Sequence, residues 1–576
     1  LARFLFALVS AAAAVASPLT FQIHSPDINS ETRTLAARDV ELEVTMEGFL
    51  AESRLRMTIP NDLFDAQAEA IMNFELPPGS IPTGMMLDVG GMMVEGVGVE
   101  KWRALVAYET EVGRRVDPAL LSYRGEDRYR VQLYPIQYKG TRTIEIRWTQ
   151  QLHPDADTLV YEFPFSVAAD VEWKSVVFRS VPESGLAVDG FDPDITWTER
   201  ESDGALELSA GRSSTGDGGT AGVTAAGGSV IRASIAAGRN LDRWWAGEYR
   251  GSSYAGIRYD SPTRSEVSGA SLNVIWDASY SRRFYGDGDE VGALMSLLSD
   301  LGVSTVSLHL FADGVVHVGD FSAPWSNLRR RLNAVSYEGH SDIDELVSFL
   351  DANRETPAVF VSDFLESSGA SFDPIDVPLV VVSSTTSTSS YYHYTALRQL
   401  VAAAGGEYWR IDRNRSTTLT NRIAGALSPT VSDSAAGVAI KNHNDEGLLE
   451  GEFRAGAEFS EAAEGARQFR LLRDFGRYVE GLRILRRYNV PSAWAIRREE
   501  RESIAVHDLV TPFSSLLVLE TAEQYAQYGV EPPEAVPFDR GEYEELVKTA
   551  PQVPRWVENR YRDFVDVVED AAEWLA

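Results

Sequence analysis

Three oxygen-bearing side chains lie two residues apart at the end of an apolar run. Residues 271–276 are mostly apolar, as is typical of a strand buried in a parallel sheet, and Asp277, Ser279 and Ser281 follow them. Hard divalent cations bind oxygen ligands, and open α/β sheets bind ligands at the carboxyl ends of their strands. The spacing therefore predicts half of a Mg²⁺ site, although a serine-rich turn that caps the next helix explains it equally well.

Two later segments supply further candidate ligands. Ser341 lies just before an apolar-periodic helix that starts near residue 343, and Asp363 directly follows the buried-strand run 358–362. Asp342 is next to Ser341 and is an alternative oxygen donor. In a doubly wound fold the loops that carry these residues meet at one edge of the sheet, so we expect them to converge.

In order, spacing and strand context, these residues resemble the metal-ion-dependent adhesion site of the von Willebrand factor type A family. The resemblance covers about residues 268–430. It implies that one Mg²⁺, with Ca²⁺ or Mn²⁺ as alternatives, is bound by Asp277, Ser279, Ser281, Ser341 and Asp363. The family's second loop commonly reads Gly-Gly-Thr, whereas here it reads Gly-His-Ser over residues 339–341. Whether Ser341 or Asp342 faces the metal therefore stays open.

Composition narrows the class of protein. The chain of 576 residues is long enough for several domains, and a hydrophobic content of 44% with 24% charged residues is ordinary for globular proteins. A formal net charge of −32 argues against a nucleic-acid partner, which requires a basic face. Because the chain has no cysteine, disulfides and thiolate metal sites are excluded.

The amino-terminal residues have the layout of a secretory signal peptide. Arg3 precedes the apolar run 4–9, and residues 14–16 read Ala-Val-Ala. We predict a signal peptide over residues 1–16 and export to the periplasm, the cell surface or the extracellular space. The end of a longer membrane segment is the alternative.

Residues 17–151 predict a β-sandwich with one helix. Residues 40–50 and 55–59 alternate between apolar and polar side chains, and 101–113 have helical spacing. Alternating residues on both sides of Lys139 and Gly140 suggest a hairpin. Short motifs such as Phe-Glu-Leu-Pro-Pro-Gly at 74–79 make this segment resemble the vault protein inter-alpha-trypsin (VIT) domain. That domain precedes the A domain in inter-alpha-trypsin inhibitor heavy chains and exported bacterial relatives.

The remaining segments complete a multidomain α/β plus β protein. Residues 152–267 predict a β-rich connecting module with a glycine- and serine-rich loop at 211–229. Within 268–430 we predict a doubly wound α/β domain, with a helix at 289–301, a hairpin around Asp313 and Gly314 and a buried strand at 377–382. The last part, 431–576, predicts β segments and carboxy-terminal helices; its expected elements are strands at 438–453 and 510–520 and helices at 460–488 and 554–575.

No common enzyme motif is present, so we predict that the chain is not an enzyme. One predicted function is an exported adhesion protein that grips the carboxylate of a protein or an acidic polymer through Mg²⁺. The alternative is a structural component of the cell envelope or extracellular scaffold in which the metal only stabilises the A domain. A hydrolase whose site the sequence does not reveal is a third, weaker hypothesis.

Overall fold

The chain folds into two compact units. An α/β unit holds the described residues from 271 to 427, and a β-rich unit holds those from 17 to 258 and from 439 to 549. The computed structural model describes residues 17–26, 31–48, 50–77, 80–114, 118–125, 128–155, 158–166, 171, 173–180, 185–191, 195–202, 205–211, 231–236, 245–249, 252–258, 271–285, 290–363, 377–383, 407–411, 423, 427, 438–442, 476–478, 480–481, 484 and 507–549.

One sheet of the β-rich unit has seven antiparallel strands. Its order is β3-β2-β6-β11-β10-β30-β9. The strands are β3 (Arg33–Ala36), β2 (Thr20–His24), β6 (Ala68–Glu75), β11 (Arg128–Ile136), β10 (Ala119–Gly125), β30 (Ser514–Val518) and β9 (Val97–Glu100). Helix α1 (Lys101–Arg114) begins directly after β9, where a helix was predicted. The predicted strand at 510–520 is confirmed as β30.

A second sheet has eight strands in the order β18-β19-β16-β4-β5-β12-β7-β8. The strands are β18 (Thr198–Ser202), β19 (Ala205–Gly211), β16 (Trp173–Ser180), β4 (Arg38–Glu47), β5 (Leu50–Pro60), β12 (Thr141–Gln151), β7 (Ile81–Val89) and β8 (Met92–Glu95). Strand β16 pairs in parallel with β4. The predicted boundary at residue 151 therefore falls inside this sheet.

Apolar and polar residues alternate along strands such as β4, which bury only one face. In β4, Val40, Leu42 and Val44 are fully buried, and the residues between them are partly exposed. Phe165 contacts Phe74 of the seven-stranded sheet, with ring centroids 5.6 Å apart, and Trp148 of the eight-stranded sheet at 6.0 Å. The buried faces of the two sheets are thus connected through aromatic packing, as in a β-sandwich.

The predicted hairpin around Lys139 and Gly140 is wrong. Strand β11 pairs with β6 and β10, whereas β12 pairs with β5 and β7, so the chain crosses between sheets at this turn. The turn is held by Asn61, whose N–H donates to the Gly140 carbonyl at 2.9 Å and whose carbonyl accepts from the Lys139 N–H at 3.0 Å. Alternating side chains on both sides of a turn indicate two strands, but they do not specify which strands pair.

The described residues of the β-rich unit also form three smaller sheets. They are β1-β15, β13-β14-β20-β17 and β21-β22-β29. Their strands are β1 (Ser17–Pro18), β15 (Phe165–Ser166), β13 (His153–Asp155), β14 (Thr158–Glu162), β20 (Arg232–Ala236), β17 (Ala187–Asp189), β21 (Trp245–Tyr249), β22 (Ser252–Arg258) and β29 (Val438–Asn442). Since β22 and β29 are neighbours, the α/β segment is inserted in sequence between two adjacent strands.

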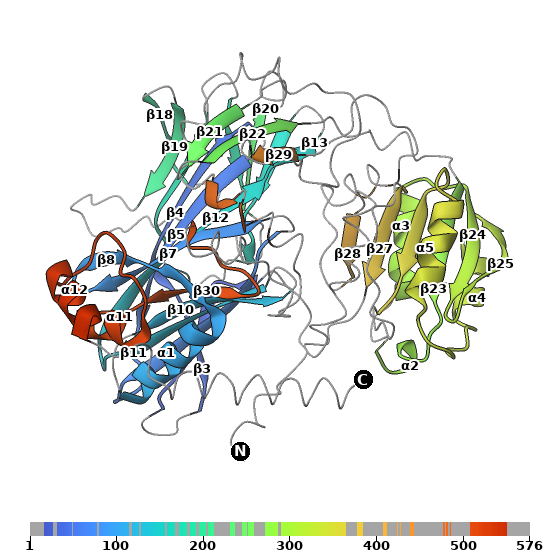
Figure 1. Ribbon diagram of the computed structural model, residues 1–576. Coiled ribbons are helices and arrows are strands. Elements are labelled where there is room, and N and C mark those ends of the chain that lie inside the picture. Colours follow the sequence, from blue (N-terminus) through green and yellow to red (C-terminus); the bar gives the residue numbers. More distant parts are fainter. Residues whose placement is uncertain are drawn as a thin grey trace. The chain divides into compact units, whose positions relative to one another are not determined.

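Two short helices, α11 (Ala522–Tyr528) and α12 (Arg540–Thr549), follow β30. They lie together with α1 at one side of the β-rich unit in Figure 1. The predicted signal peptide, most of the loop at 211–229 and the helix at 554–575 lie outside the described residues. So does most of the helix at 460–488, of which Tyr478 and Ile484 are described and buried.

The α/β unit contains a six-stranded sheet in the order β25-β24-β23-β26-β27-β28. The strands are β25 (Val315–Ser322), β24 (Thr305–Phe311), β23 (Ser271–Asp277), β26 (Ala358–Val361), β27 (Leu379–Ser383) and β28 (Glu407–Arg410). All pair in parallel except β25, which forms the predicted hairpin with β24. This is the doubly wound order, and its switch point lies between β23 and β26.

Helices α3 (Glu290–Asp300) and α4 (Ser326–Leu332) cover one face of this sheet, and α5 (Ile343–Ala352) covers the other. The short helix α2 (Arg282–Tyr285) directly follows the loop after β23. Val274 belongs to a core with Leu294 and Leu328 of α3 and α4, whereas its neighbour Ile275 belongs to a core with Leu346 of α5. Because successive strand residues point to opposite faces, a continuous apolar run is required in β23.

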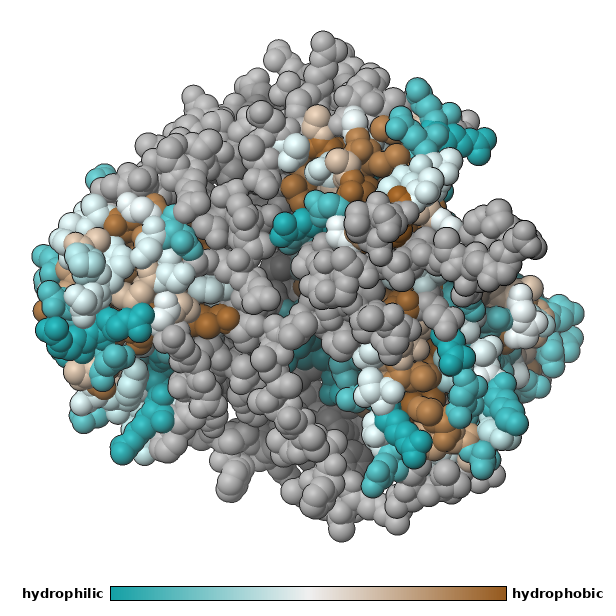
Figure 2. Space-filling model, turned by 180° about the vertical axis from the view of Figure 1, so that it is seen from behind, coloured by the Kyte–Doolittle hydropathy of each residue, from teal (hydrophilic) through white to brown (hydrophobic). Residues whose placement is uncertain are grey.

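Large exposed hydrophobic side chains are few among the described residues. They are Met92, Tyr138, Tyr280, Val316 and Val547. In Figure 2 hydrophilic residues gather at the left and right edges of the view, and hydrophobic residues show further in. None of the described helices is long and apolar enough to cross a membrane.

Candidate metal centre

Two buried carboxylates occupy the switch point of the six-stranded sheet. Asp277 ends β23 and Asp363 follows β26, and these strands are paired neighbours. Asp277 is 0% exposed and Asp363 is 1% exposed. Parallel strands that end side by side bring residues 86 positions apart to one edge of the sheet.

Hydrogen bonds connect the three residues of the first loop to Asp363. The Ser279 N–H donates to Asp277 Oδ1 at 2.9 Å, and the Ser279 and Ser281 hydroxyls lie 3.0 Å apart. The Ser281 hydroxyl then donates to Asp363 Oδ1 at 3.2 Å. Four of the five predicted ligands therefore form one cluster.

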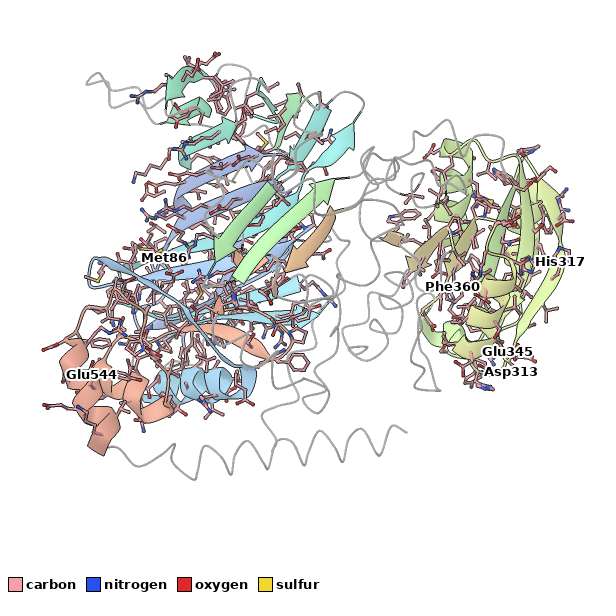
Figure 3. The ribbon with its side chains drawn as sticks, turned by 45° about the horizontal axis from the view of Figure 1, so that its top comes forward. Met86, Asp313, His317, Glu345, Phe360 and Glu544 are labelled. Atoms are coloured by element: carbon pink, nitrogen blue, oxygen red, sulfur yellow. The ribbon has the colours of Figure 1, made fainter. Side chains whose placement is uncertain are left out.

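The loop that carries Ser341 is held against the first loop by its backbone. The Glu338 N–H donates to the Ala278 carbonyl at 2.8 Å, and the Tyr280 N–H donates to the Gly339 carbonyl at 3.0 Å. Ser341 is therefore delivered to the same edge of the sheet by a separate loop. Figure 3 places Asp313 and Glu345, which flank this loop, together at that end of the α/β unit.

Asp313 fixes the shape of this second loop. Its Oδ1 accepts from the His340 N–H at 3.0 Å, and this hydrogen bond, followed by the charge of His340, lowers the pKa of Asp313 below its usual value. Gly339 has a φ of +81°, and a Cβ there would lie 2.8 Å from Asp313 Oδ2. Only glycine suits both the backbone conformation and the close approach.

Asp342 and Ser341 differ in their hydrogen bonds. Asp342 is the N-cap of α5, and its carboxylate accepts from the Glu345 N–H at 3.4 Å. Ser341 is 4% exposed, and its hydroxyl has no hydrogen-bond partner among the described residues. Because its hydroxyl is buried without such a partner, Ser341 is the better candidate of the two to bind a ligand.

Two further side chains shape the cluster, and the sequence motif did not indicate either of them. The Ser362 hydroxyl donates to Asp277 Oδ2 at 2.5 Å, and Arg282 Nε donates to the Asp277 carbonyl at 3.3 Å. Ser362 was visible as a hydroxyl at the end of an apolar run beside Asp363. Arg282 was visible only as a cation directly after the motif.

Arg282 is buried and pairs with Glu290 at the start of α3. Both guanidinium Nη atoms lie 2.5 Å from the Glu290 oxygens, and the guanidinium carbon lies 5.3 Å from the Trp276 ring centroid. Burial alone would lower the pKa of Arg282, but the charge of Glu290, then of Asp277 and Asp363, raises it above its ordinary value. A buried cation whose charge is paired with Glu290 therefore lies directly beside Asp277.

The donor set suits a hard divalent cation, because all five side chains offer oxygen. Over the described residues there is no cluster of three or more His, Asp or Glu that could hold a metal ion. A cation at this edge would thus depend on the serine hydroxyls as much as on its two carboxylates. The buried Ser341 hydroxyl is the structural feature that most favours such a ligand.

Part of the β-rich unit matches a known protein family. Residues 37–148 match the family model of the vault protein inter-alpha-trypsin domain. This segment is a VIT domain. The resemblance found in the sequence is confirmed for it, and the matched VIT residues contain strands of both large sheets together with α1. No curated protein matches the chain significantly.

Solved structures share only a weak likeness with the chain. An aerotolerance-related membrane protein from Bacteroides fragilis is 12% identical over 28% of this chain and 98% of its own length, with a TM-score of 0.21. Aminopeptidase A from Legionella pneumophila is 11% identical over 62% of this chain and 32% of its own length, with a TM-score of 0.22. This chain thus covers about a third of the aminopeptidase, and similarity at this level indicates neither a fold nor a function.

Proposed function

We propose that this chain is an exported binding protein whose α/β unit is a von Willebrand factor type A domain with a metal-dependent site. The observation that carries the proposal is the buried Ser341 hydroxyl, which has no hydrogen-bond partner among the described residues. It stands on a loop that is hydrogen-bonded to the Asp277–Ser281 loop. The doubly wound strand order and the position of Asp277 and Asp363 at its switch point support the same proposal.

In this proposal Asp277, Asp363 and the hydroxyls of Ser279, Ser281 and Ser341 hold Mg²⁺, with Ca²⁺ or Mn²⁺ as substitutes. Two carboxylates balance the charge of the ion, which leaves it able to attract an acidic oxygen from a partner. The partner is a protein or an acidic polymer that presents a carboxylate. The role is binding rather than catalysis, at the cell envelope or outside the cell.

Calorimetry with Mg²⁺ tests the proposal. Wild type should bind one ion. Asp277→Ala should abolish binding because it removes a carboxylate ligand, and the fold should survive because the residue lies at the edge of the sheet. Asp344→Ala is the matched control: it removes the same charge from an exposed position in the first turn of α5. Equal Mg²⁺ affinity in wild type and Asp277→Ala would refute the site.

A scaffold role is the second candidate, and a specific observation favours it. Asp277 already accepts from Ser279 and Ser362, and Asp363 accepts from Ser281, so protein donors alone engage both carboxylates. Under this alternative the cluster only joins the Asp277–Ser281 loop to Asp363, and any metal there only stabilises the α/β unit. A pulldown from the native envelope with and without EDTA separates the two functions, since loss of partners in EDTA is expected only for metal-dependent binding.

A further inference from the structure

The VIT domain is completed by a strand that lies far outside the matched segment. Strand β30 lies between β9 and β10 and pairs antiparallel with both; Leu517 is opposite Val97 on one side and Leu120 on the other. All five residues of β30 are buried. The match to the VIT family ends at residue 148, so the matched segment by itself leaves a gap between two of its own strands.

The helix after β30 shares a hydrophobic core with α1. Tyr525, Tyr528 and Leu517 belong to one buried cluster with Ala104 and Tyr108. Thr521 forms a capping box at the start of α11, and Gly529, with a φ of +60°, ends the helix in a left-handed conformation. The segment therefore has its own local start and stop signals, while its apolar face depends on the VIT domain.

A buried carboxylate of α1 also depends on this segment. Glu111 is 2% exposed and accepts hydrogen bonds from the Tyr528 hydroxyl at 2.5 Å and from Gln524 Nε2 at 3.1 Å. Arg114 donates to the same carboxylate at 3.0 Å from within α1. Removal of the segment would take two of these three donors away, which is costly for a buried charge.

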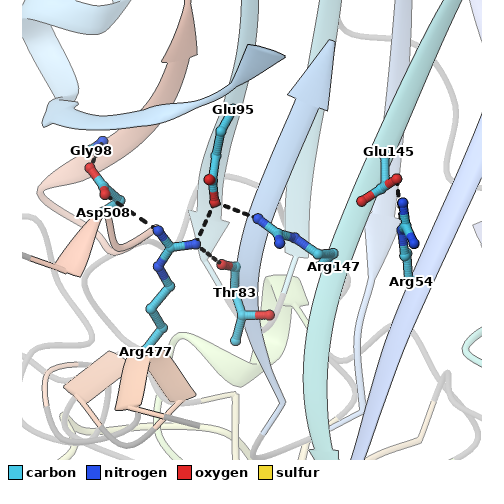
Figure 4. A network of polar contacts seen from close by, with 8 residues as sticks. All are labelled: Arg54, Thr83, Glu95, Gly98, Glu145, Arg147, Arg477 and Asp508. Atoms are coloured by element: carbon cyan, nitrogen blue, oxygen red, sulfur yellow. Dashed lines mark hydrogen bonds and ion pairs between the residues drawn. The ribbon is translucent and has the colours of Figure 1, made fainter. Parts of the chain in front are cut away.

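Further polar contacts anchor the segment at its amino-terminal side, as Figure 4 shows in part. Asp508 Oδ1 accepts from the Gly98 N–H at 2.8 Å, and the Phe513 carbonyl accepts from the Lys101 N–H at 2.7 Å. Glu520 pairs with Arg142 at 2.9 Å. The contacts thus extend from residue 508 to residue 528 and involve β9, α1 and β12.

We propose that residues 507–530 form a non-covalent clasp, and that the groove between β9 and β10 is a strand-acceptor site specific for this segment of the same chain. The groove offers the backbone hydrogen-bonding edges of β9 and β10, buried apolar side chains and the Glu111 carboxylate. It fits an extended apolar strand followed by a capped helix that carries a tyrosine and a glutamine. The clasp should stay bound when the chain between β29 and residue 507 is cut. It does not depend on the proposed metal site.

The test uses the full chain with a site for a sequence-specific protease inserted between Arg498 and Glu499. After purification and cleavage, the fragment 499–576 should remain bound through gel filtration, and native mass spectrometry should give the mass of one cleaved chain. An excess of labelled synthetic peptide 507–549 then measures the release rate. Elution of the wild-type fragment apart from the rest overturns the proposal, and a dimer that exchanges fragments overturns the assignment to the same chain.

Variants show whether the described contacts hold the clasp. Tyr528→Phe keeps the ring and loses the hydrogen bond to Glu111, so the fragment should leave about tenfold faster. Tyr138→Phe is the matched control, because Tyr138 is 46% exposed and lies outside the groove. Leu517→Asp should release the fragment immediately after cleavage. Equal release rates for Tyr528→Phe and Tyr138→Phe would contradict the proposed contact.

Discussion

The hydroxyl of Ser281 donates a hydrogen bond of 3.2 Å to Asp363, which lies 82 residues further along the chain. This contact joins the loop after β23 to the loop after β26 at the switch point of the sheet. Doubly wound sheets bind ligands there because the helices that follow the two strands leave on opposite faces.

Ser341→Ala and Asp342→Ala should have opposite effects. Ser341→Ala removes no hydrogen bond among the described residues, so the free energy of unfolding should stay unchanged while Mg²⁺ affinity falls by about tenfold. Asp342→Ala removes the cap of α5 and should cost about 1 kcal/mol, with Mg²⁺ affinity retained. Urea unfolding and calorimetry on both variants check this, and reduced affinity in Asp342→Ala alone would reverse the assignment.

The buried ion pair beneath the site should be important for stability. Glu290→Gln leaves the Arg282 guanidinium buried without its carboxylate and should lower the free energy of unfolding by about 3–5 kcal/mol. Asp351→Asn is the matched control. It breaks the Arg354 pair, whose side chains are 58% and 47% exposed, and should cost about 0–1 kcal/mol. Similar urea midpoints for the two variants would show that Glu290 does not stabilise the buried cation.

Gly84 of the VIT domain should not tolerate a side chain. A Cβ at Gly84 would lie 2.3 Å from Nη2 of Arg147, which is 1% exposed and paired with Glu95. Gly84→Ala should therefore cost about 1–3 kcal/mol, because the new methyl group would push the buried guanidinium away from Glu95. Gly113→Ala, in α1 with nothing within 4 Å of the new Cβ, should stabilise by about 0.5–1 kcal/mol. Thermal unfolding of both variants measures the contrast.

Lys101 should make the free energy of unfolding increase with pH above neutrality. Burial, together with the nearby charge of Arg124, lowers the pKa of Lys101 to about 7 from 10.5. Between these values the unfolded chain binds a proton that the folded chain does not, so stability should rise as pH increases from about 7 to 10.5. Lys101→Met should remove up to about 1.4 kcal/mol per pH unit from this slope. Urea midpoints measured at several pH values check it, and parallel slopes in both proteins would contradict the lowered pKa.

Local patterns in the sequence determined most of the elements and part of the site. Alternation located β4 and β5, helical spacing located α1, and the run before Asp277 identified a strand buried on both faces. These features depend on side-chain periodicity, which is a property of neighbouring residues. The candidate oxygen ligands for the proposed metal followed from the same reasoning, since buried parallel strands end at a common edge.

Only the tertiary structure decided which distant segments meet. The turn at Lys139 joins two sheets rather than two paired strands, and β30 fills a gap in a domain whose matched segment ends more than 300 residues earlier. Likewise the structure assigned Asp342 to the helix cap and paired Arg282 with Glu290. A strand's sequence encodes which face is buried, but its partner depends on the backbone ladder and the apolar surface left open when the chain collapses.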